Sequence, residues 1–221
     1  MNAQAKPDMP TPRIGALSGV KVLDLSRVLA GPWCTQTLAD LGAEVIKVER
    51  PGAGDDTRGW GPPFLGSAQN GDQTADAAYF LGCNRNKRSL VLDLKQPAGH
   101  AAMLKLCATA DVLIYNVRPQ AMARLKLTYD DLKAVNPKII YVGAYGFSQD
   151  GPYAAKPAYD DLIQGMVALP SIIKDAGGDR PRYVPSTVAD RITGLNAVNA
   201  VTTALFHRER TGHGQAVEVT M

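Results

Sequence analysis

The sequence predicts an α/β fold, with an open, mostly parallel Rossmann-like sheet, flanking helices and a long helix near the end of the chain. Three observations support this prediction. Short apolar runs recur between residues 20 and 146, and segments of helical character separate them. These runs are apolar on both faces, as buried parallel strands are. Beyond residue 151 the pattern changes to helices followed by one last strand-like run.

The first strand–helix–strand unit follows a polar N-terminus. The run VKVLDL at 20–25 predicts a strand, WCTQTLADLG at 33–42 predicts a helix, and AEVIKVE at 43–49 predicts a second strand. This spacing fits a right-handed crossover between parallel strands. The loop at 50–64 is rich in Gly, Pro and Asp and has no periodicity, which predicts a functional or mobile segment.

The middle of the chain continues the alternation. We expect a strand, a helix, a strand, two short helices and a fifth strand, at 88–94, 97–110, 111–117, 119–125, 128–136 and 138–146. Pro97 fits the first turn of its helix, where a missing backbone N–H costs nothing.

The last part of the chain predicts a helix at 159–169, a loop at 179–187 and a long helix at 188–210. The long helix is rich in small residues, which favours close packing against another helix. A glycine turn then leads into a strand, and the chain stops inside it. We therefore expect an N-terminal part of a longer chain, with a disordered tail at 1–14 and one large, incomplete domain at 15–221.

Composition excludes several classes of function. The chain has 221 residues, 45% of them hydrophobic, and a net charge of +3, without the clustered basic and aromatic residues of nucleic-acid binding. No apolar run approaches the length of a membrane span, and residues 1–17 have no apolar core of the signal-peptide kind. Three widely spaced cysteines without a CxxC pair indicate free thiols in a cytoplasmic protein.

The common cofactor and hydrolase motifs are also absent. No GxGxxG follows the first strand, which disfavours a dinucleotide site, and no P-loop or GxSxG elbow occurs. The three histidines lack metal-ligand spacing, so we expect no metal site. Any chemistry must rest on carboxylates, tyrosines or the backbone.

Five linked segments resemble class III CoA-transferases of the formyl-CoA and carnitine CoA-transferase type. They are VLDLSRVLAGPWCTQTLADLGAEVIKVERPGAGDDTRGWGPPF, NRNKRSLVLDLK, ADVLIYNVRPQAMARL, YGFSQDGPYAAKPAYDDLIQGM and TGHGQAVEVTM. Their order and spacing hold over about residues 15–221. The resemblance implies that a small domain and a returning C-terminal segment follow in the family, and that two chains form an interlocked homodimer.

Asp160 falls where this family places its nucleophile. Taken alone, Tyr159-Asp160-Asp161 before an apolar run reads as a helix start, because Asp is favoured there. The resemblance implies instead that the Asp160 carboxylate attacks an acyl-CoA thioester and forms a mixed anhydride, and then an enzyme–CoA thioester. An ionised carboxylate needs no histidine to be nucleophilic at neutral pH. The implied substrates are an acyl-CoA and a free carboxylic acid, with no prosthetic group.

The resemblance also implies which residues contact CoA. They are Arg27, Leu29, Ala30, Arg50, Leu92, Asp93, Leu94, Lys95, Asn116, Val117, Arg118, Arg124, Tyr145 and Gly146. Most follow predicted strands, at the edge where open parallel sheets bind ligands. The phosphates of CoA call for Arg, Lys and helix N-termini. For any one of these arginines, a solvated surface charge is as good an interpretation as a contact with CoA.

Two alternatives stay open at this point. The first is an α-methylacyl-CoA racemase, in which an aspartate matching Asp190 serves as an acid–base residue. The racemase branch carries histidine where this chain has Tyr159, so we favour the transferase and expect Asp190 to be a helix cap or an ion-pair partner. The second alternative is a non-catalytic CoA-binding fragment. The sequence leaves two roles open for Trp60: a lid residue over the ligand, or simple packing within its loop.

Overall fold

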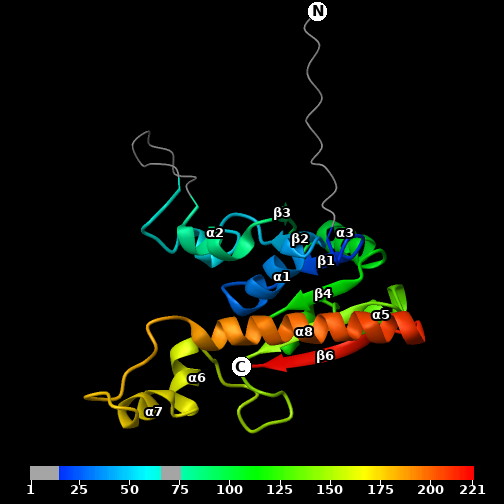
Figure 1. Cartoon of the computed structure of the whole chain (residues 1–221). Coiled ribbons are helices and arrows are strands. Elements are labelled where there is room, and N and C mark those ends of the chain that lie inside the picture. The colour runs from blue at the N-terminus through cyan, green and yellow to red at the C-terminus, as the bar shows by residue number, and fades with distance from the viewer. Residues whose placement is uncertain (1–14, 66–75) are drawn as a thin grey trace, which may run out of the picture.

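A single parallel sheet organises the chain. The computed structural model describes residues 15–65 and 76–221, so the tail predicted at 1–14 lies outside the described residues (Figure 1). The sheet of these residues has the strand order β3-β2-β1-β4-β5-β6, and every neighbouring pair is parallel. Its strands are β1 (Lys21–Asp24), β2 (Glu44–Glu49), β3 (Lys87–Val91), β4 (Val112–Tyr115), β5 (Ile140–Tyr145) and β6 (Gln215–Thr220). The predicted open parallel sheet is confirmed.

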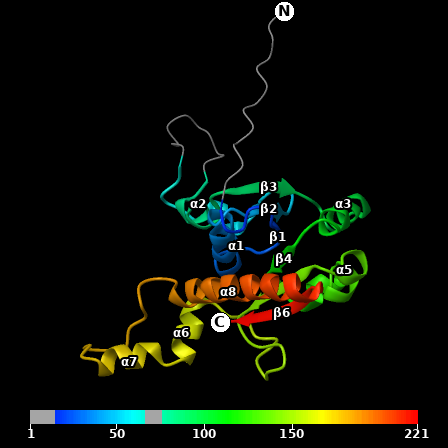
Figure 2. The same cartoon turned by 45° about the vertical axis from the view of Figure 1, so that its right-hand side comes forward.

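Helices cover both faces of the sheet (Figure 2). They are α1 (Ala30–Asp40), α2 (Ala78–Asn84), α3 (Pro97–Cys107), α4 (Pro119–Arg124), α5 (Tyr129–Val135), α6 (Asp160–Met166), α7 (Leu169–Asp175) and α8 (Val188–Thr211), with a short 3₁₀ turn η1 (Asp56–Gly59). Within the described ranges, no helix has the length and apolar character that a bilayer span requires.

Two apolar cores follow from the alternation of side chains along the strands. One core packs α1 and α8 against the sheet, with Leu38 and Val201 fully buried. The other packs α3, α4 and α5 against the opposite face, around Met103 and Leu132. Helices α1 and α8 approach closely because residue 194 is glycine: a Cβ there would lie 2.8 Å from the carbonyl oxygen of Ala30. This confirms the close helix packing expected for the small-residue-rich segment.

The strand order reverses between β1 and β4. From β1 the chain builds outward through β2 to β3, and it then returns to the other side of β1 and builds through β4 and β5 to β6. Such a reversal leaves a crevice at the carboxyl ends of the two central strands, where open α/β sheets bind their ligands. The fold therefore predicts a site at the ends of β1 and β4.

Three local features differ from the sequence-based expectation. Strand β3 is an edge strand with largely exposed side chains, rather than a strand apolar on both faces. Helix α2 was missed because its seven residues lie next to a glycine-rich stretch and show little periodicity. Helix α7 was missed because Pro170 stands in its first turn, and because none of its residues is buried.

A buried network of charged side chains lies beneath the turn that follows β1. The Asp24 carboxylate accepts hydrogen bonds from the Lys87 ammonium (3.0 Å) and the Thr35 hydroxyl (2.6 Å), and also from Ser26. Burial alone would raise the pKa of Asp24, but the neighbouring lysines and hydroxyls outweigh it and hold that pKa well below its usual range. Asp24 is therefore a stable anion inside the protein.

A second buried pair extends this network to the loop after β2. The Lys47 ammonium lies 2.9 Å from the Asp55 carboxylate and donates to the carbonyl oxygen of Ser26 at 2.9 Å. Asp55 in turn faces the backbone N–H of Val28 at 3.3 Å and 3.4 Å. Val28 has a φ of 70°, a left-handed conformation that is strained for a β-branched residue. The pair thus supports a turn that would not be stable by itself.

We predict that Lys47→Met lowers the free energy of unfolding by about 3–5 kcal/mol, because it leaves the buried Asp55 carboxylate without its counter-charge. Urea unfolding measures this change. The control is Arg88→Met, which breaks the exposed ion pair with Glu44 and should cost only about 0–1 kcal/mol. Equal losses in the two variants would contradict a supporting role for the buried pair.

Candidate active site

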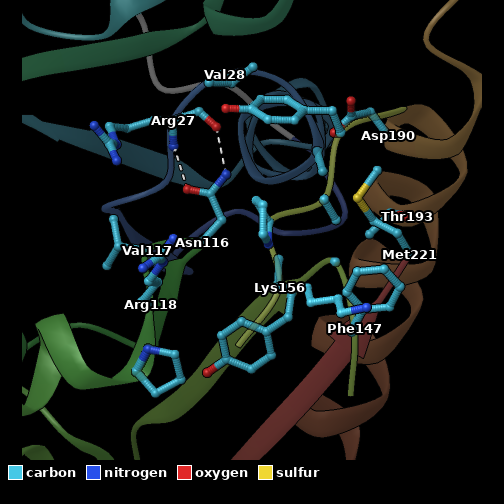
Figure 3. A pocket seen from close by; sticks show the side chains of 18 of the residues that line it. Arg27, Val28, Asn116, Val117, Arg118, Phe147, Lys156, Asp190, Thr193 and Met221 are labelled. Carbon is cyan, nitrogen blue, oxygen red and sulfur yellow. Dashed lines mark hydrogen bonds between the residues drawn. The ribbon is translucent and has the colours of Figure 1, made fainter. Parts of the chain in front are cut away.

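The turn after β1 is fixed to the end of β4 by one asparagine. The Asn116 side chain accepts a hydrogen bond from the backbone N–H of Arg27 (2.8 Å) and donates one to the carbonyl oxygen of Arg27 (2.6 Å). These two bonds, drawn as dashed lines in Figure 3, join the carboxyl ends of the central strands across the point where the strand order reverses. The prediction that Arg27 and Asn116 meet at one edge of the sheet is confirmed as geometry.

A polar hollow of about 390 Å³ opens at this edge. Seven of the residues expected to contact CoA line it: Arg27, Ala30, Asn116, Val117, Arg118, Tyr145 and Gly146. Figure 3 shows Arg27 and Arg118 on one side of the hollow, and Asp190, Thr193 and Met221 on the other. The hollow therefore has a cationic wall from the strand ends and a wall from the start of α8 that carries a carboxylate.

Asp160 lies behind this hollow as the first residue of α6. It is only 6% exposed and does not itself line the hollow, whereas Tyr159 before it and Asp190 beside it do. Its Oδ2 accepts the backbone N–H of Asp190 at 2.9 Å, and its Oδ1 accepts from the Gln164 side-chain amide at 2.5 Å. Both carboxylate oxygens thus have a hydrogen-bond donor.

The position of Asp160 is compatible with both interpretations of the sequence, the helix cap and the proposed nucleophile. Tyr159 is the N-cap residue of α6 and makes no side-chain capping bond, and Thr187 at the N-cap of α8 makes none either. Asp160 instead supplies an acceptor to the first turn of α8, where backbone N–H groups lack helical partners and the helix dipole favours an anion. Asp160 thus caps a neighbouring helix and lies next to Tyr159 and Asp190, which line the hollow.

Asp190 does not cap its own helix, because the N-cap residue of α8 is Thr187, and among the residues described no salt bridge involves Asp190. Its carboxylate instead forms a hydrogen bond with the backbone amide of Ala30, the first residue of α1. Burial and the nearby charge of Asp160 raise the pKa of Asp190 to about 6, and the Ala30 backbone amide opposes this shift. The site therefore holds two close carboxylates, and the pKa of Asp190 is raised.

The arginines Arg27 and Arg50 converge on Asp56. The Arg27 guanidinium lies 3.5 Å from the Asp56 carboxylate, and the Arg50 guanidinium forms a hydrogen bond with the same group. All three side chains are substantially exposed, so these pairs contribute little to stability and leave the arginines accessible. Arg50 lines a separate shallow hollow next to Arg58.

A third hollow at the same edge carries Leu94, Lys95 and Arg124 from the predicted CoA-contacting set. His100 and Lys126 also line it, which makes it rich in cationic side chains. Of the remaining predicted residues, Leu29 is buried at the N-cap of α1, and Leu92 packs against the second core. The Asp93 side chain accepts the N–H of Lys95 and so stabilises the turn after β3.

Trp60 packs within its loop and also lines the main hollow, so a lid role stays a prediction. Its ring packs edge-on against Tyr79 with 5.4 Å between centroids, and the residue lines the main hollow. The loop that carries it is anchored by Arg58, whose guanidinium donates to the Glu49 and Asp76 carboxylates and lies over the Phe80 ring. The segment after β2 is therefore held to the sheet at its base.

Sequence reasoning missed several residues that the fold brings to the site. Asp56, Lys156 and Thr193 line the main hollow, and Gln164 binds Asp160. None of them lies in a recognisable catalytic pattern, although Asp56 falls within the loop that we singled out. Tyr145 lines the hollow, and its hydroxyl forms a hydrogen bond with that of Tyr115. In the part of the chain that the structure describes, no group of His, Cys, Asp and Glu has the arrangement of a metal site.

Comparison with known proteins decides the family. The model of CoA-transferase family III matches residues 17–221. This chain belongs to CoA-transferase family III. The sequence is 47% identical over 214 residues to a succinate–glutarate CoA-transferase of Agrobacterium fabrum, with 97% of this chain and 52% of that protein covered. It is 41% identical over 207 residues to an acetyl-CoA:oxalate CoA-transferase of Acetobacter aceti, with 94% and 51% covered.

The fold of this family III chain agrees with a solved relative. The crystal structure of a CAIB/BAIF family protein from Brucella suis superposes with a TM-score of 0.86 at 44% identity, and 94% of this chain and 53% of that chain are covered. The chain thus spans about half the length of the relatives that it matches. The resemblance seen in the sequence is confirmed.

We predict that Asp190 makes the stability of this chain pH-dependent. Its pKa is about 6 when folded and about 3.8 in the unfolded chain, so the folded state binds more protons between these values. Ionisation then costs stability as the pH rises from about 4 to about 6. Asp190→Asn removes this cost, and its stability relative to the wild type should rise by about 1–3 kcal/mol between pH 4 and pH 7.

Urea unfolding at the two pH values measures the difference. The matched control is Asp161→Asn, which neutralises an exposed aspartate of α6. Its free energy of unfolding relative to the wild type should change less between pH 4 and pH 7. A difference between wild type and Asp190→Asn that is the same at both pH values would contradict the prediction.

Proposed function

We propose that this chain supplies the CoA-binding domain and the nucleophile of an enzyme that transfers CoA from an acyl-CoA to a free carboxylic acid. The observation that carries the proposal is the Asp160 carboxylate, which is held by two donors and lies next to Tyr159 and Asp190, two residues that line the hollow where the strand order reverses. Membership of CoA-transferase family III supports CoA transfer in general. The proposed domain is residues 15–221.

CoA binding is assigned to the carboxyl edge of the sheet. The nucleotide end of CoA carries a pyrophosphate and a 3′-phosphate, which favour cationic side chains. The hollow with Lys95, Arg124 and Lys126 suits these groups by its charge. The hollow between β1 and β4 then takes the thioester end, because this hollow is lined by Tyr159 and Asp190, the neighbours of Asp160.

The proposed reaction passes through two covalent adducts of Asp160. The carboxylate attacks the thioester carbonyl carbon, the C–S bond breaks, and a mixed anhydride and CoA thiolate form. The thiolate attacks the Asp160 carbonyl carbon of the anhydride, which releases the donor acid and leaves an enzyme–CoA thioester. The acceptor carboxylate repeats these steps in reverse order, so that a new acyl-CoA leaves and the Asp160 carboxylate is regenerated.

We assign small dicarboxylic acids as the substrate class. The names of the two relatives contain succinate, glutarate and oxalate, which all carry a second carboxylate. The hollow carries cations for such a group: Arg118, and Lys156, whose ammonium lies 4.1 Å from the centre of the Tyr153 ring. Within the described residues neither side chain forms a salt bridge.

Assembly and location are proposed on the resemblance alone. We propose a cytoplasmic, interlocked homodimer whose subunits each contain this domain. A racemase is the less favoured function, because Tyr159 stands where that branch carries histidine, and unperturbed tyrosine is a poor base at neutral pH.

We predict that Asp160→Asn abolishes CoA transfer and the adduct that hydroxylamine traps at residue 160, because an amide is not an effective nucleophile. Mass spectrometry of the protein incubated with succinyl-CoA and hydroxylamine measures the adduct. Tyr159→Phe is the control and should retain the adduct. Rapid α-deuterium uptake by a 2-methylacyl-CoA in heavy water, without any adduct at Asp160, would contradict the transferase function and support the racemase function.

We predict that Arg124→Ala weakens CoA binding by about 1–3 kcal/mol, as expected for the loss of a charged hydrogen bond to phosphate. Calorimetric titration with CoA and with 3′-dephospho-CoA measures the effect. Arg182→Ala, which removes an exposed arginine paired with Asp179 far along the chain, is the control. Unchanged affinity in Arg124→Ala would remove the third hollow from the CoA site.

A further inference from the structure

Gln164 connects the proposed nucleophile to the segment that precedes α8. It lies one turn after Asp160 on the same helix, and only 1% of it is exposed. We propose that Gln164 is a positioning residue, which fixes the Asp160 carboxylate for attack on the thioester. This inference rests on the proposed function, because it assigns a role to a neighbour of the nucleophile.

The orientation of the Gln164 amide is determined by its partners. The backbone N–H of Val184 donates to Oε1 at 2.9 Å, so the oxygen must face the segment before α8. The NH₂ group then faces Asp160 and donates to its Oδ1 at 2.5 Å and to the carbonyl oxygen of Ser186 at 3.2 Å. Every polar atom of the side chain is satisfied, and the reversed amide would place oxygen against the carboxylate and against Ser186.

This arrangement restrains the carboxylate from two directions. Gln164 donates to Oδ1 from within α6, and the N–H of Asp190 donates to Oδ2 from the first turn of α8. Two donors on different elements fix the plane of the carboxylate, which a single bond would let rotate. Each oxygen retains a lone pair, since a carboxylate oxygen accepts more than one hydrogen bond. The two donors therefore orient the Asp160 carboxylate and leave lone pairs on its oxygens for attack.

The chain offers a matched comparison for this role. Gln36 on α1 is also 1% exposed, and it also joins its helix to another segment: it donates to the carbonyl oxygen of Gly82 and accepts the N–H of Arg85, both at 3.0 Å. In contrast to Gln164, it has no hydrogen bond to a carboxylate within residues 15–65 and 76–221. Loss of Gln36 therefore reports the cost of losing a buried structural glutamine alone.

The experiment compares Gln164→Met and Gln36→Met with the wild type. The readout is the rate at which the hydroxylamine-trappable adduct forms at Asp160, measured over a range of succinyl-CoA concentrations. Both variants lose stability to urea. We expect Gln164→Met alone to lower the maximal rate, by about 10- to 100-fold, as misplacement of a reacting group does. The half-saturating concentration stays within about twofold, because CoA binds at the strand ends.

A second variant, Gln164→Glu, keeps the acceptor for Val184 and the side-chain shape but removes the donor to Asp160. This variant tests the positioning role if Gln164→Met does not fold. We expect it to lose at least as much of the maximal rate as Gln164→Met. A wild-type rate in a folded Gln164 variant, or an equal loss in Gln36→Met, would overturn the inference. An adduct that persists in Asp160→Asn would instead overturn the proposed function, so the two failures are distinguishable.

Discussion

The buried pairing of Lys47 with Asp55 and of Lys87 with Asp24 is the constraint on which the site depends. Four charges lie under one turn, and each has its hydrogen bonds satisfied by backbone carbonyls, hydroxyls or amides. Such a network adds little stability over an apolar core, but removal of one member leaves an uncompensated charge. Its contribution is therefore geometric: it holds the left-handed Val28, and through it the turn that carries Arg27 to Asn116.

A second constraint acts where α6 and α8 begin. The two carboxylates of Asp160 and Asp190 lie close together in a site of reduced solvation, and like charges there oppose each other. Asp160 accepts hydrogen bonds from both the Gln164 amide and the N-terminal backbone of α8. Burial and the nearby charge of Asp160 raise the pKa of Asp190 to about 6. One arrangement of donors thus orients the proposed nucleophile beside a carboxyl group with a raised pKa.

Much of the fold could be predicted from the sequence, because buried parallel strands are continuous apolar runs and their ends bring residues to one edge. That reasoning placed Arg27 and Asn116 together, and the resemblance marked Asp160. The sequence-based prediction failed where contacts between residues that are distant in the sequence determine the local structure. The lone lysines Lys47 and Lys87 look like surface charges within strands, but only 2% of each side chain is exposed. Gln164 has no local signature, since its partners lie 20 residues or more along the chain, except Asp160.

The structure divides recognition and chemistry between different elements. Loops at the strand ends carry the cations Arg27, Arg118 and Arg124, which are solvated and adaptable, and a charged ligand can be drawn to them without displacing buried groups. The proposed reacting carboxylate sits on a helix, is buried, and has its orientation set by groups that make no contact with solvent. Because a carboxylate in such a place does not reorganise when the substrate arrives, the cost of orienting it is met during folding rather than during the reaction. The division also explains why the strand-end residues were visible in sequence while the groups that orient Asp160 were not.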